Sequence, residues 1–189
     1  MDSQPKPQLT PQQYLAWERQ QATRHEFFDG EIFAMTGASR EHNLVCGNAF
    51  ATLHAQLRGK PCELYNNDMR VKVSDTGMYT YPDIAAACAE PQFEDAEVDT
   101  LINPALMIEV LSDSTEQYDR GAKFQHYRTL PSLQDYLLIA QTECQVEHYV
   151  REASSRWLMT EYRSLDDRIK LASIDCDLLL RDLYERVLH

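Results

Sequence analysis

The sequence predicts an α/β fold, and three observations lead to this prediction. Two almost continuous apolar runs, YPDIAAAC (81–88) and ALMIEVLS (105–112), are typical of central strands that are buried on both faces of a sheet. The Asp-Gly pair within HEFFDGEIFAM (25–35) indicates a β-hairpin with a tight turn. Apolar residues recur with helical spacing over 39–58 and predict a long helix.

Length and composition set limits on the class of protein. A chain of 189 residues has the length of one domain, so we expect residues 1–9, with their two prolines, to be a flexible lead and residues 10–189 to form a single domain. The sequence has no basic start followed by an apolar stretch, so we expect no signal peptide. It also has no apolar run of about 18 residues, so we expect no membrane span.

The net charge of −12 lowers the expectation of a nucleic-acid partner, because nonspecific binding normally uses a broad basic face. A pocket that combines metal ions with a few local cations remains compatible with that charge.

Cysteine usage indicates the compartment. The chain has five cysteines, at Cys46, Cys62, Cys88, Cys144 and Cys176. They are odd in number, lie far apart and form no CxxC pair, so we expect reduced thiols that serve packing, rather than disulfides or zinc ligands. A cytoplasmic location is the corresponding expectation.

The N-terminal third contains two helices and the hairpin. Thr10 is placed to cap a short helix over TPQQYLAWERQQ, with Pro11 at its first position. In the hairpin, a two-residue type I′ turn would place Glu26 opposite Phe33. The helix of 39–58 has one apolar stripe, formed by Leu44, Val45, Ala49, Leu53 and Leu57.

The rest of the chain alternates between strands and helices. CELYNNDMRVKV predicts strands before the first apolar run, and the five acids of 90–99 predict a solvated loop, with gating of a nearby site as the lesser alternative. TEQYDRGAKFQHYRTL (115–130) predicts a helix, capped by Ser112, Ser114 or Thr115. LQDYLLIA, CQVEHYVRE and RWLMTEY predict three further strands, and CDLLLRDLYERVL (176–188) predicts a terminal helix.

Each of the two apolar runs contains one carboxylate, Asp83 in the first and Glu109 in the second. Neighbouring strands would bring these side chains close together, where each carboxylate raises the pKa of the other unless a cation is shared. A hard divalent ion with oxygen ligands, most plausibly Mg²⁺, would resolve the conflict. The alternative is a pair of strand-end acids that point to solvent or bond to backbone amides.

The helix that follows offers a second group of polar side chains on one face. Asp119, Lys123 and Tyr127 are spaced i, i+4 and i+8. Asp119 would favour the charged form of Lys123, which suits an orienting and charge-stabilising ammonium. The alternative is a solvated ion pair worth a few tenths of a kcal/mol. Tyr118, Phe124 and Tyr127 are expected to pack, with base stacking as the minor alternative.

These residues together resemble a known family. YPDIAAA, MIEVLSDSTEQYDRGAKFQHYRTLPSLQDYLLI, HEFFDGEIFAMTG and REHNLV, in this order and spacing, resemble the Uma-two-type family of restriction endonucleases, whose members are similar to PD-(D/E)xK nucleases. The resemblance extends from about Tyr14 to Tyr184. It implies a restriction-endonuclease-like core, in which a mixed sheet of about five strands is flanked by helices, with the hairpin and extra C-terminal strands added.

The resemblance also implies a site. Asp83 and Glu109 match the two motif acids, whereas Leu111 occupies the position where the superfamily has its lysine. Lys123, in an Asp-x-x-x-Lys pattern, is the candidate that replaces this lysine from the following helix. Asp83, Glu109 and the Val110 carbonyl would hold Mg²⁺, with Mn²⁺ as a substitute, and Lys123 would steady the attacking water and the developing charge.

Three further residues complete the predicted site. Glu26 is a candidate extra ligand or water-orienting catalytic acid, and His42 and Arg120 are candidates for contacts with substrate phosphate. For Glu26 and His42, an ordinary surface or capping role is the alternative.

The predicted function is a homodimeric, Mg²⁺-dependent endonuclease that acts on DNA, without excluding RNA. The alternative is a noncatalytic nucleic-acid-binding or regulatory module that keeps the nuclease fold, which Leu111 and the net charge of −12 favour.

Overall fold

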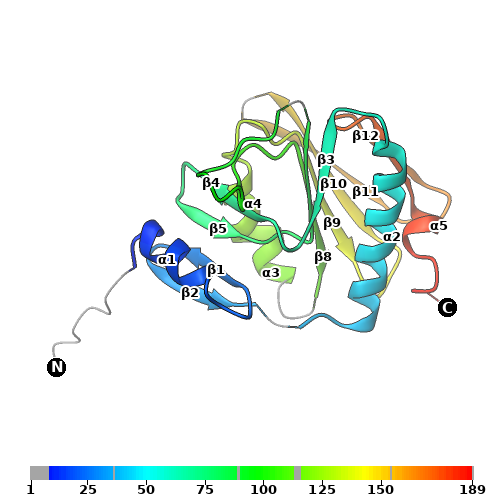
Figure 1. The fold of residues 1–189 in the computed structure, drawn as a ribbon. Helices are drawn as coiled ribbons and strands as arrows, with labels where there is room; N and C mark the ends of the chain where they lie inside the picture. Colours follow the sequence, from blue (N-terminus) through cyan, green and yellow to red (C-terminus); the bar gives the residue numbers. More distant parts are fainter. Residues whose placement is uncertain (1–8, 36, 89, 113–115, 154, 189) are drawn as a thin grey trace.

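The computed structural model describes residues 9–35, 37–88, 90–112, 116–153 and 155–188 (Figure 1). The predicted lead lies outside the described residues except for Leu9, and so do two of the three proposed capping residues, Ser114 and Thr115.

The centre of the fold is a mixed six-stranded sheet in the order β11-β10-β9-β8-β6-β3. Its strands are β3 (Cys62–Asn66), β6 (Ile84–Cys88), β8 (Leu106–Leu111), β9 (Asp135–Ala140), β10 (Val146–Ala153) and β11 (Arg156–Tyr162). Strands β8 and β9 pair in parallel, and the other neighbours are antiparallel. The two apolar runs of the sequence are therefore the adjacent strands β6 and β8, and the predicted mixed sheet flanked by helices is confirmed.

A second sheet has the order β2-β1-β5-β4-β7. Its strands are β1 (His25–Phe28), β2 (Glu31–Ala34), β4 (Arg70–Val73), β5 (Met78–Thr80) and β7 (Thr100–Leu101). The hairpin register is confirmed, since Glu26 lies opposite Phe33, and both turn residues have positive φ, 48° at Asp29 and 80° at Gly30. Phe27 pairs with Tyr79, which joins the hairpin to β5.

Helices cover both faces of the central sheet. On one face lies α2 (Arg40–Leu57), which is capped by Ser39 and packs its buried stripe, Val45, Ala49, Leu53 and Leu57, against the sheet (Figure 1). The other face packs against a broken helix composed of α3 (Glu116–Tyr118), the π-helix η1 (Asp119–Lys123) and α4 (Phe124–Tyr127). Alternation along the strands separates the faces, because Ile108 and Val110 point toward α2 whereas Met107 and Leu111 point toward α4.

Helix α1 (Pro11–Glu18) begins at the predicted cap. Thr10 and Gln13 form a reciprocal capping box, with the Thr10 hydroxyl accepting a hydrogen bond from the Gln13 amide at 3.2 Å. Tyr14 is fully buried in a small cluster with Phe27 and Tyr79, which ties the helix to the second sheet.

The prediction of a terminal helix over 176–188 is wrong on both sides of a short helical segment. Residues 176–179 form strand β13 (Cys176–Leu179), paired with β12 (Arg168–Leu171), and only α5 (Leu180–Leu183) is helical. The reason is that Cys176 and Leu178 are buried with period two, in register with the β12 strand. The leucine run continues across the strand–helix junction, so its apolar character could not locate the boundary.

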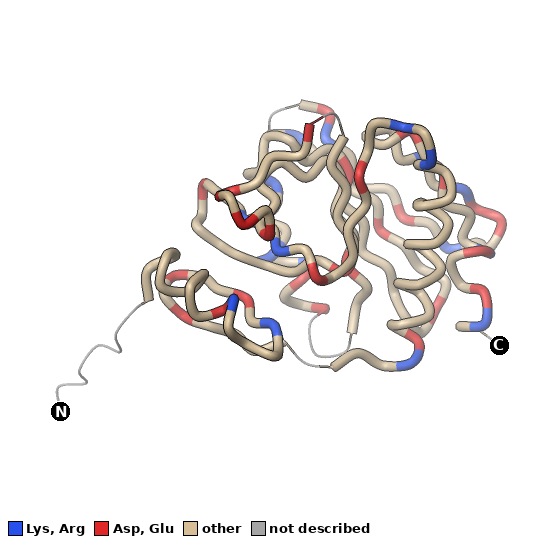
Figure 2. The backbone as a smooth tube through the Cα atoms, in the orientation of Figure 1, with Lys and Arg blue, Asp and Glu red and all other residues tan. Residues whose placement is uncertain are grey.

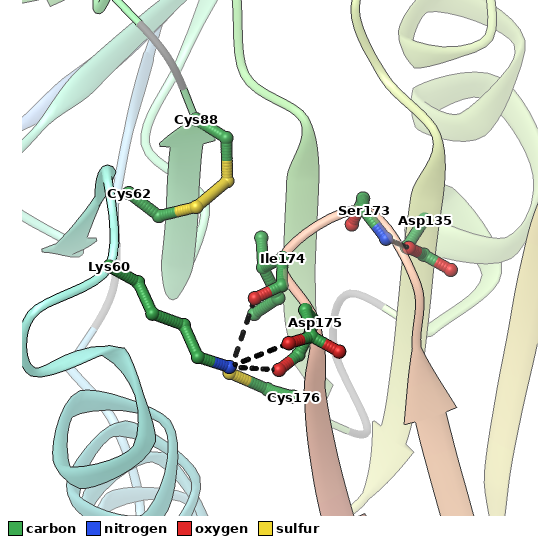
Figure 3. Close-up of a disulfide and its surroundings, with 8 residues drawn as sticks. All are labelled: Lys60, Cys62, Cys88, Asp135, Ser173, Ile174, Asp175 and Cys176. Carbon is green, nitrogen blue, oxygen red and sulfur yellow. Dashed lines mark hydrogen bonds and ion pairs between the residues drawn. A yellow bond between two sulfur atoms is a disulfide. The ribbon is translucent and has the colours of Figure 1, made fainter.

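The expectation of reduced thiols is wrong for two cysteines. Cys62 and Cys88 are joined by a disulfide (Figure 3). They lie directly opposite each other in the antiparallel pair β3 and β6, a proximity that depends on strand pairing and not on sequence spacing. Cys46, Cys144 and Cys176 are free.

The acidic segment 90–99 is a largely irregular loop, as predicted, with residues 95–98 exposed, and ion pairs attach it to the rest of the fold. Asp95 and Asp99 both form ion pairs at 2.8 Å with Arg19, and Glu94 forms one at 2.6 Å with Lys72. These contacts fasten the segment to α1 and β4. None of the described helices is long and apolar enough to cross a membrane.

Candidate active site

The pairing of β6 with β8 brings the two strand carboxylates together. Ile84 lies opposite Ile108, so that Asp83, one residue before β6, comes opposite Glu109. Asp83 accepts a hydrogen bond from the Val110 amide at 2.8 Å, and its carboxylate lies 3.2 Å from His42 Nε2. Antiparallel register therefore places the two residues opposite each other, and the charge of Asp83 contributes to the raised pKa of Glu109.

The ammonium of Lys123 lies among three carboxylates. Its Nζ is 3.0 Å from Glu109 Oε1, 3.1 Å from Glu26 Oε1 and 3.5 Å from Asp119 Oδ1. The Lys123 side chain is only 7% exposed, so this is a buried cluster and the solvated ion pair is not what forms. Asp119 and Lys123 are the first and last residues of η1, and single π-helical turns inside α-helices are often found at functional sites.

The position of Leu111 explains why the ammonium comes from a helix. Glu109 and Leu111 share one face of β8, and Leu111 is buried in the apolar cluster that contains Tyr127 and Leu130. The broken helix covers that same face and places Lys123 beside Glu109. The Lys123 ammonium therefore approaches Glu109 from the helix that covers this face of the sheet.

Two hydroxyl groups complete the cluster. The Tyr127 hydroxyl donates to Glu109 Oε1 at 2.8 Å and lies 2.9 Å from the Thr80 hydroxyl, which in turn donates to Glu26. The helical spacing predicts Tyr127 on this face, whereas the sequence pattern does not predict Thr80. Its only signal in the sequence is its place three residues before Asp83.

The electrostatics of the cluster are unbalanced toward negative charge. Burial raises the pKa of Glu109 to about 8, Lys123 opposes this rise, and the nearby carboxylates Asp119, Asp83 and Glu26 add to it. Burial alone would lower the pKa of Lys123, but Glu109, Tyr127, Glu26 and Asp119 outweigh it, so its pKa lies well above its ordinary value. Lys123 is thus a fixed cation, and the three carboxyl groups of Glu109, Glu26 and Asp119 share it.

This donor set fits a hard divalent cation. Carboxylate oxygens are the ligands that Mg²⁺ prefers, and a second positive charge would compensate the surplus of acids around Lys123. Asp83 and Glu109 would supply these oxygens, with the Val110 carbonyl as the third predicted ligand. The fit rests on ligand type and on charge.

The two residues predicted to contact substrate have different surroundings. His42, in the first turn of α2, faces Asp83; burial lowers its pKa, but the hydrogen bond and charge of Asp83 outweigh this and raise it. Arg120 forms an ion pair at 2.9 Å with Glu116 and a second one with Glu147. His42 therefore lies beside Asp83, whereas the ion pairs of Arg120 are with Glu116 and with Glu147 on β10.

The aromatic residues of the broken helix mostly pack, as expected. Phe124 stacks on Tyr136 with ring centroids 5.2 Å apart, and Tyr127 is fully buried. Tyr118 differs from them, because it is 39% exposed and its ring lies 5.9 Å from Lys123 Nζ.

Comparison with known proteins identifies relatives over nearly the whole chain. Residues 11–180 match the family Uma2, described as "Putative restriction endonuclease". Two proteins of Synechocystis sp. (strain ATCC 27184 / PCC 6803 / Kazusa) are similar. "Uncharacterized protein slr1290" is 37% identical over 182 residues, covering 96% of this chain and 94% of that protein. "Uncharacterized protein sll1609" is 39% identical over 153 residues, covering 81% of this chain and 86% of that protein.

A solved structure shares the fold. It is described as a putative nuclease belonging to DUF820 from Anabaena variabilis ATCC 29413, and it aligns with a TM-score of 0.78 over 95% of this chain and 99% of that chain. At 17% identity the likeness shows the fold. The match over residues 11–180 shows that the chain belongs to the Uma2 family.

Proposed function

We propose that this protein is a Mg²⁺-dependent endonuclease that hydrolyses phosphodiester bonds of DNA. The observation that supports this most directly is the buried contact of 3.0 Å between Lys123 Nζ and Glu109 Oε1, with Asp83 opposite Glu109 just before β6. It supplies a carboxylate pair and an ammonium at one place although Leu111 occupies the usual lysine position. Mn²⁺ is expected to replace Mg²⁺.

The residues divide the chemistry among them. Asp83, Glu109 and the Val110 carbonyl would hold the metal, which when bound supplies polarisation of the phosphate and activation of water. Lys123 holds a permanent positive charge where the attacking water and the developing negative charge on phosphate must be stabilised. Glu26 fixes one side of the ammonium and offers an acceptor that can orient water, while Tyr127 fixes the Glu109 carboxylate.

The acidic character of the chain bears on the substrate. Lys and Arg positions are interspersed with Asp and Glu over the described backbone (Figure 2). DNA affinity would then depend on metal and on local contacts such as His42 and Arg120, and would be weak without a divalent ion. We propose DNA as the substrate, with RNA as the alternative that shares the same metal chemistry.

A homodimer belongs to this proposal, because a two-fold pair of sites is the natural geometry for cutting both strands of a duplex. Sedimentation of the purified protein tests this oligomeric state.

A cytoplasmic location remains a prediction.

The second candidate function is a noncatalytic nucleic-acid-binding or regulatory module, which the net charge of −12 favours. Calorimetry with Mn²⁺ separates the two. Binding that is lost in Glu109→Ala supports the nuclease, whereas no binding at millimolar Mn²⁺ supports the noncatalytic module.

Plasmid nicking tests the activity itself. Wild-type protein with Mg²⁺ or Mn²⁺ should convert supercoiled DNA to nicked or linear forms, and Asp83→Ala and Lys123→Ala should each reduce the rate by about 1,000-fold or more. Lys170→Ala is a matched control, since Lys170 is 58% exposed and pairs with Asp175 on the β12–β13 side of the molecule. Equal cleavage by wild type and both site variants would reject the proposal.

A further inference from the structure

A second set of ligating atoms lies beside the carboxylate cluster. His42 and Cys46 are one helical turn apart on α2, with Cys46 Sγ 3.5 Å from His42 Nδ1. Asp83 approaches the same point from the start of β6, with Oδ2 3.2 Å from His42 Nε2. One ligand atom from each residue lies within 4.8 Å of the others.

The surroundings of this group suit a bound ion. The side chains of His42 and Asp83 are 13% and 12% exposed, and Cys46 is half-buried, so the group is sheltered but can be reached from solvent. Four-coordinate zinc has ligands at about 2.0–2.3 Å, which separates them from one another by about 3.3–3.8 Å. The three ligand atoms, within 4.8 Å of one another, exceed the longer of these separations by at most about 1 Å.

The chemistry of the three ligands differs from that of the Mg²⁺ site. Imidazole and thiolate ligands select borderline-soft ions such as Zn²⁺, whereas Mg²⁺ prefers oxygen ligands. A site formed by the pattern His-x-x-x-Cys and a carboxylate from another element therefore favours a different metal ion from the one that the Asp83 and Glu109 pair favours. Cys46 had been expected only to pack.

We propose that His42, Cys46 and Asp83 form a binding site for Zn²⁺ or a similar transition-metal ion, with a fourth position open to water. Asp83 belongs both to this site and to the proposed Mg²⁺ site, so the two ions compete for one carboxylate. This competition, unlike the site itself, rests on the proposed function. It would make cleavage sensitive to the ratio of Zn²⁺ to Mg²⁺.

Cobalt titration tests the site without any need for activity. Co²⁺ added to the full-length protein, with the disulfide left intact, should give a thiolate-to-cobalt absorption band and bind one equivalent, and Zn²⁺ should displace it. Cys46→Ser should abolish the band and weaken Zn²⁺ binding by about 100-fold or more, since loss of an outer-shell partner alone costs 10- to 100-fold. Cys144→Ser, which changes another partly buried free thiol, should leave both unchanged.

His42→Ala is the second variant, and it should weaken Zn²⁺ binding while circular dichroism confirms that each variant is folded. A cobalt spectrum without a thiolate band, or a band that persists in Cys46→Ser, would overturn the site. Zn²⁺ binding that is equally strong in wild type, Cys46→Ser and His42→Ala would identify an adventitious ion only and would also overturn it.

The competition has its own readout. In the nicking assay with Mg²⁺, the Zn²⁺ concentration that halves each variant's own rate should rise by at least about tenfold in Cys46→Ser. If this Zn²⁺ concentration is unchanged, Zn²⁺ and Mg²⁺ do not compete for Asp83. The cobalt titration alone would then test the zinc site. If the protein cleaves nothing, the nuclease proposal fails, and the cobalt result still decides the zinc site.

Discussion

Glu109 and Asp135 are both buried carboxylates on the adjacent parallel strands β8 and β9, yet their surroundings are opposite in character. Asp135 lies 2.6 Å from His148 Nε2 and accepts a hydrogen bond from the Ser173 amide at 3.0 Å. Burial raises its pKa, but His148 and Ser173 outweigh burial, so its pKa is lowered. Glu109 competes with other acids for one ammonium, and its pKa is raised.

The difference distinguishes Asp135, an acid with a structural role, from Glu109, an acid to which we assign a role in the proposed metal site. Donors from the protein fully compensate Asp135, so it needs nothing further. The Glu109 cluster has more carboxylates than cations, and an external cation would relieve the excess. A buried acid with a raised pKa beside like charges is thus the better pointer to a metal site than burial alone.

The largest effect should come from removing each acid in turn. Glu109→Gln is expected to abolish Mn²⁺ binding and to reduce nicking by about 1,000-fold or more, because it removes a proposed ligand. Asp135→Asn should leave nicking within a few fold and instead lower the free energy of unfolding by about 1–3 kcal/mol through its hydrogen bonds. Urea denaturation and the nicking assay measure the two quantities. A Glu109→Gln protein that remained stable and active would show that Glu109, like Asp135, is not needed for cleavage.

The comparison also shows what could be predicted from the sequence. Asp83 and Glu109 could be paired because each interrupts an apolar run, and Lys123 because it shares a helix face with Asp119. Asp135 and His148 gave no such signal, since their contact depends on the register of β9 and β10. Thr80 and the Cys62–Cys88 pair likewise depend on strand partners far along the chain. Local patterns therefore located the acids, and tertiary pairing decided which groups surround them.

The next largest effect concerns stability and its rescue by metal. Lys123→Met leaves the buried carboxylates without their ammonium and should cost about 3–5 kcal/mol of unfolding free energy, as for other broken buried pairs. His148→Leu should cost a comparable amount at Asp135. Thermal melts with and without Mn²⁺ distinguish the two regions. Mn²⁺ should restore part of the loss only in Lys123→Met, and equal rescue of both variants would contradict the charge argument.

The two acids should also respond to pH in opposite directions. The raised pKa of Glu109, about 8, means that it favours the folded state at low pH, and this contribution is lost as pH rises from about 4.5 through 8. The lowered pKa of Asp135 gives a contribution that is present above its ordinary value near 3.8 and is lost as pH falls.

Metal affinity should follow the Glu109 proton. Because a metal ion must displace that proton, Mn²⁺ affinity should rise by up to about tenfold per pH unit below 8 and level off above it. Calorimetry at pH 6, 7, 8 and 9 measures this, and Mn²⁺ affinity that is constant over the range would show that Glu109 is not a ligand.

The smallest expected effect tests how Glu109 is positioned. Tyr127→Phe removes the hydroxyl that bonds Glu109 and Thr80, so it should lower the free energy of unfolding by about 1–2 kcal/mol. With its carboxylate less well held, Glu109 should also bind Mn²⁺ about tenfold more weakly. Tyr136→Phe is the matched control, because Tyr136 is equally buried but bonds the Asp119 carbonyl at 3.3 Å and not a carboxylate. Tyr136→Phe should alter stability alone, and equal losses of Mn²⁺ affinity in both variants would mean that packing, rather than the hydrogen bond to Glu109, sets the geometry of the cluster.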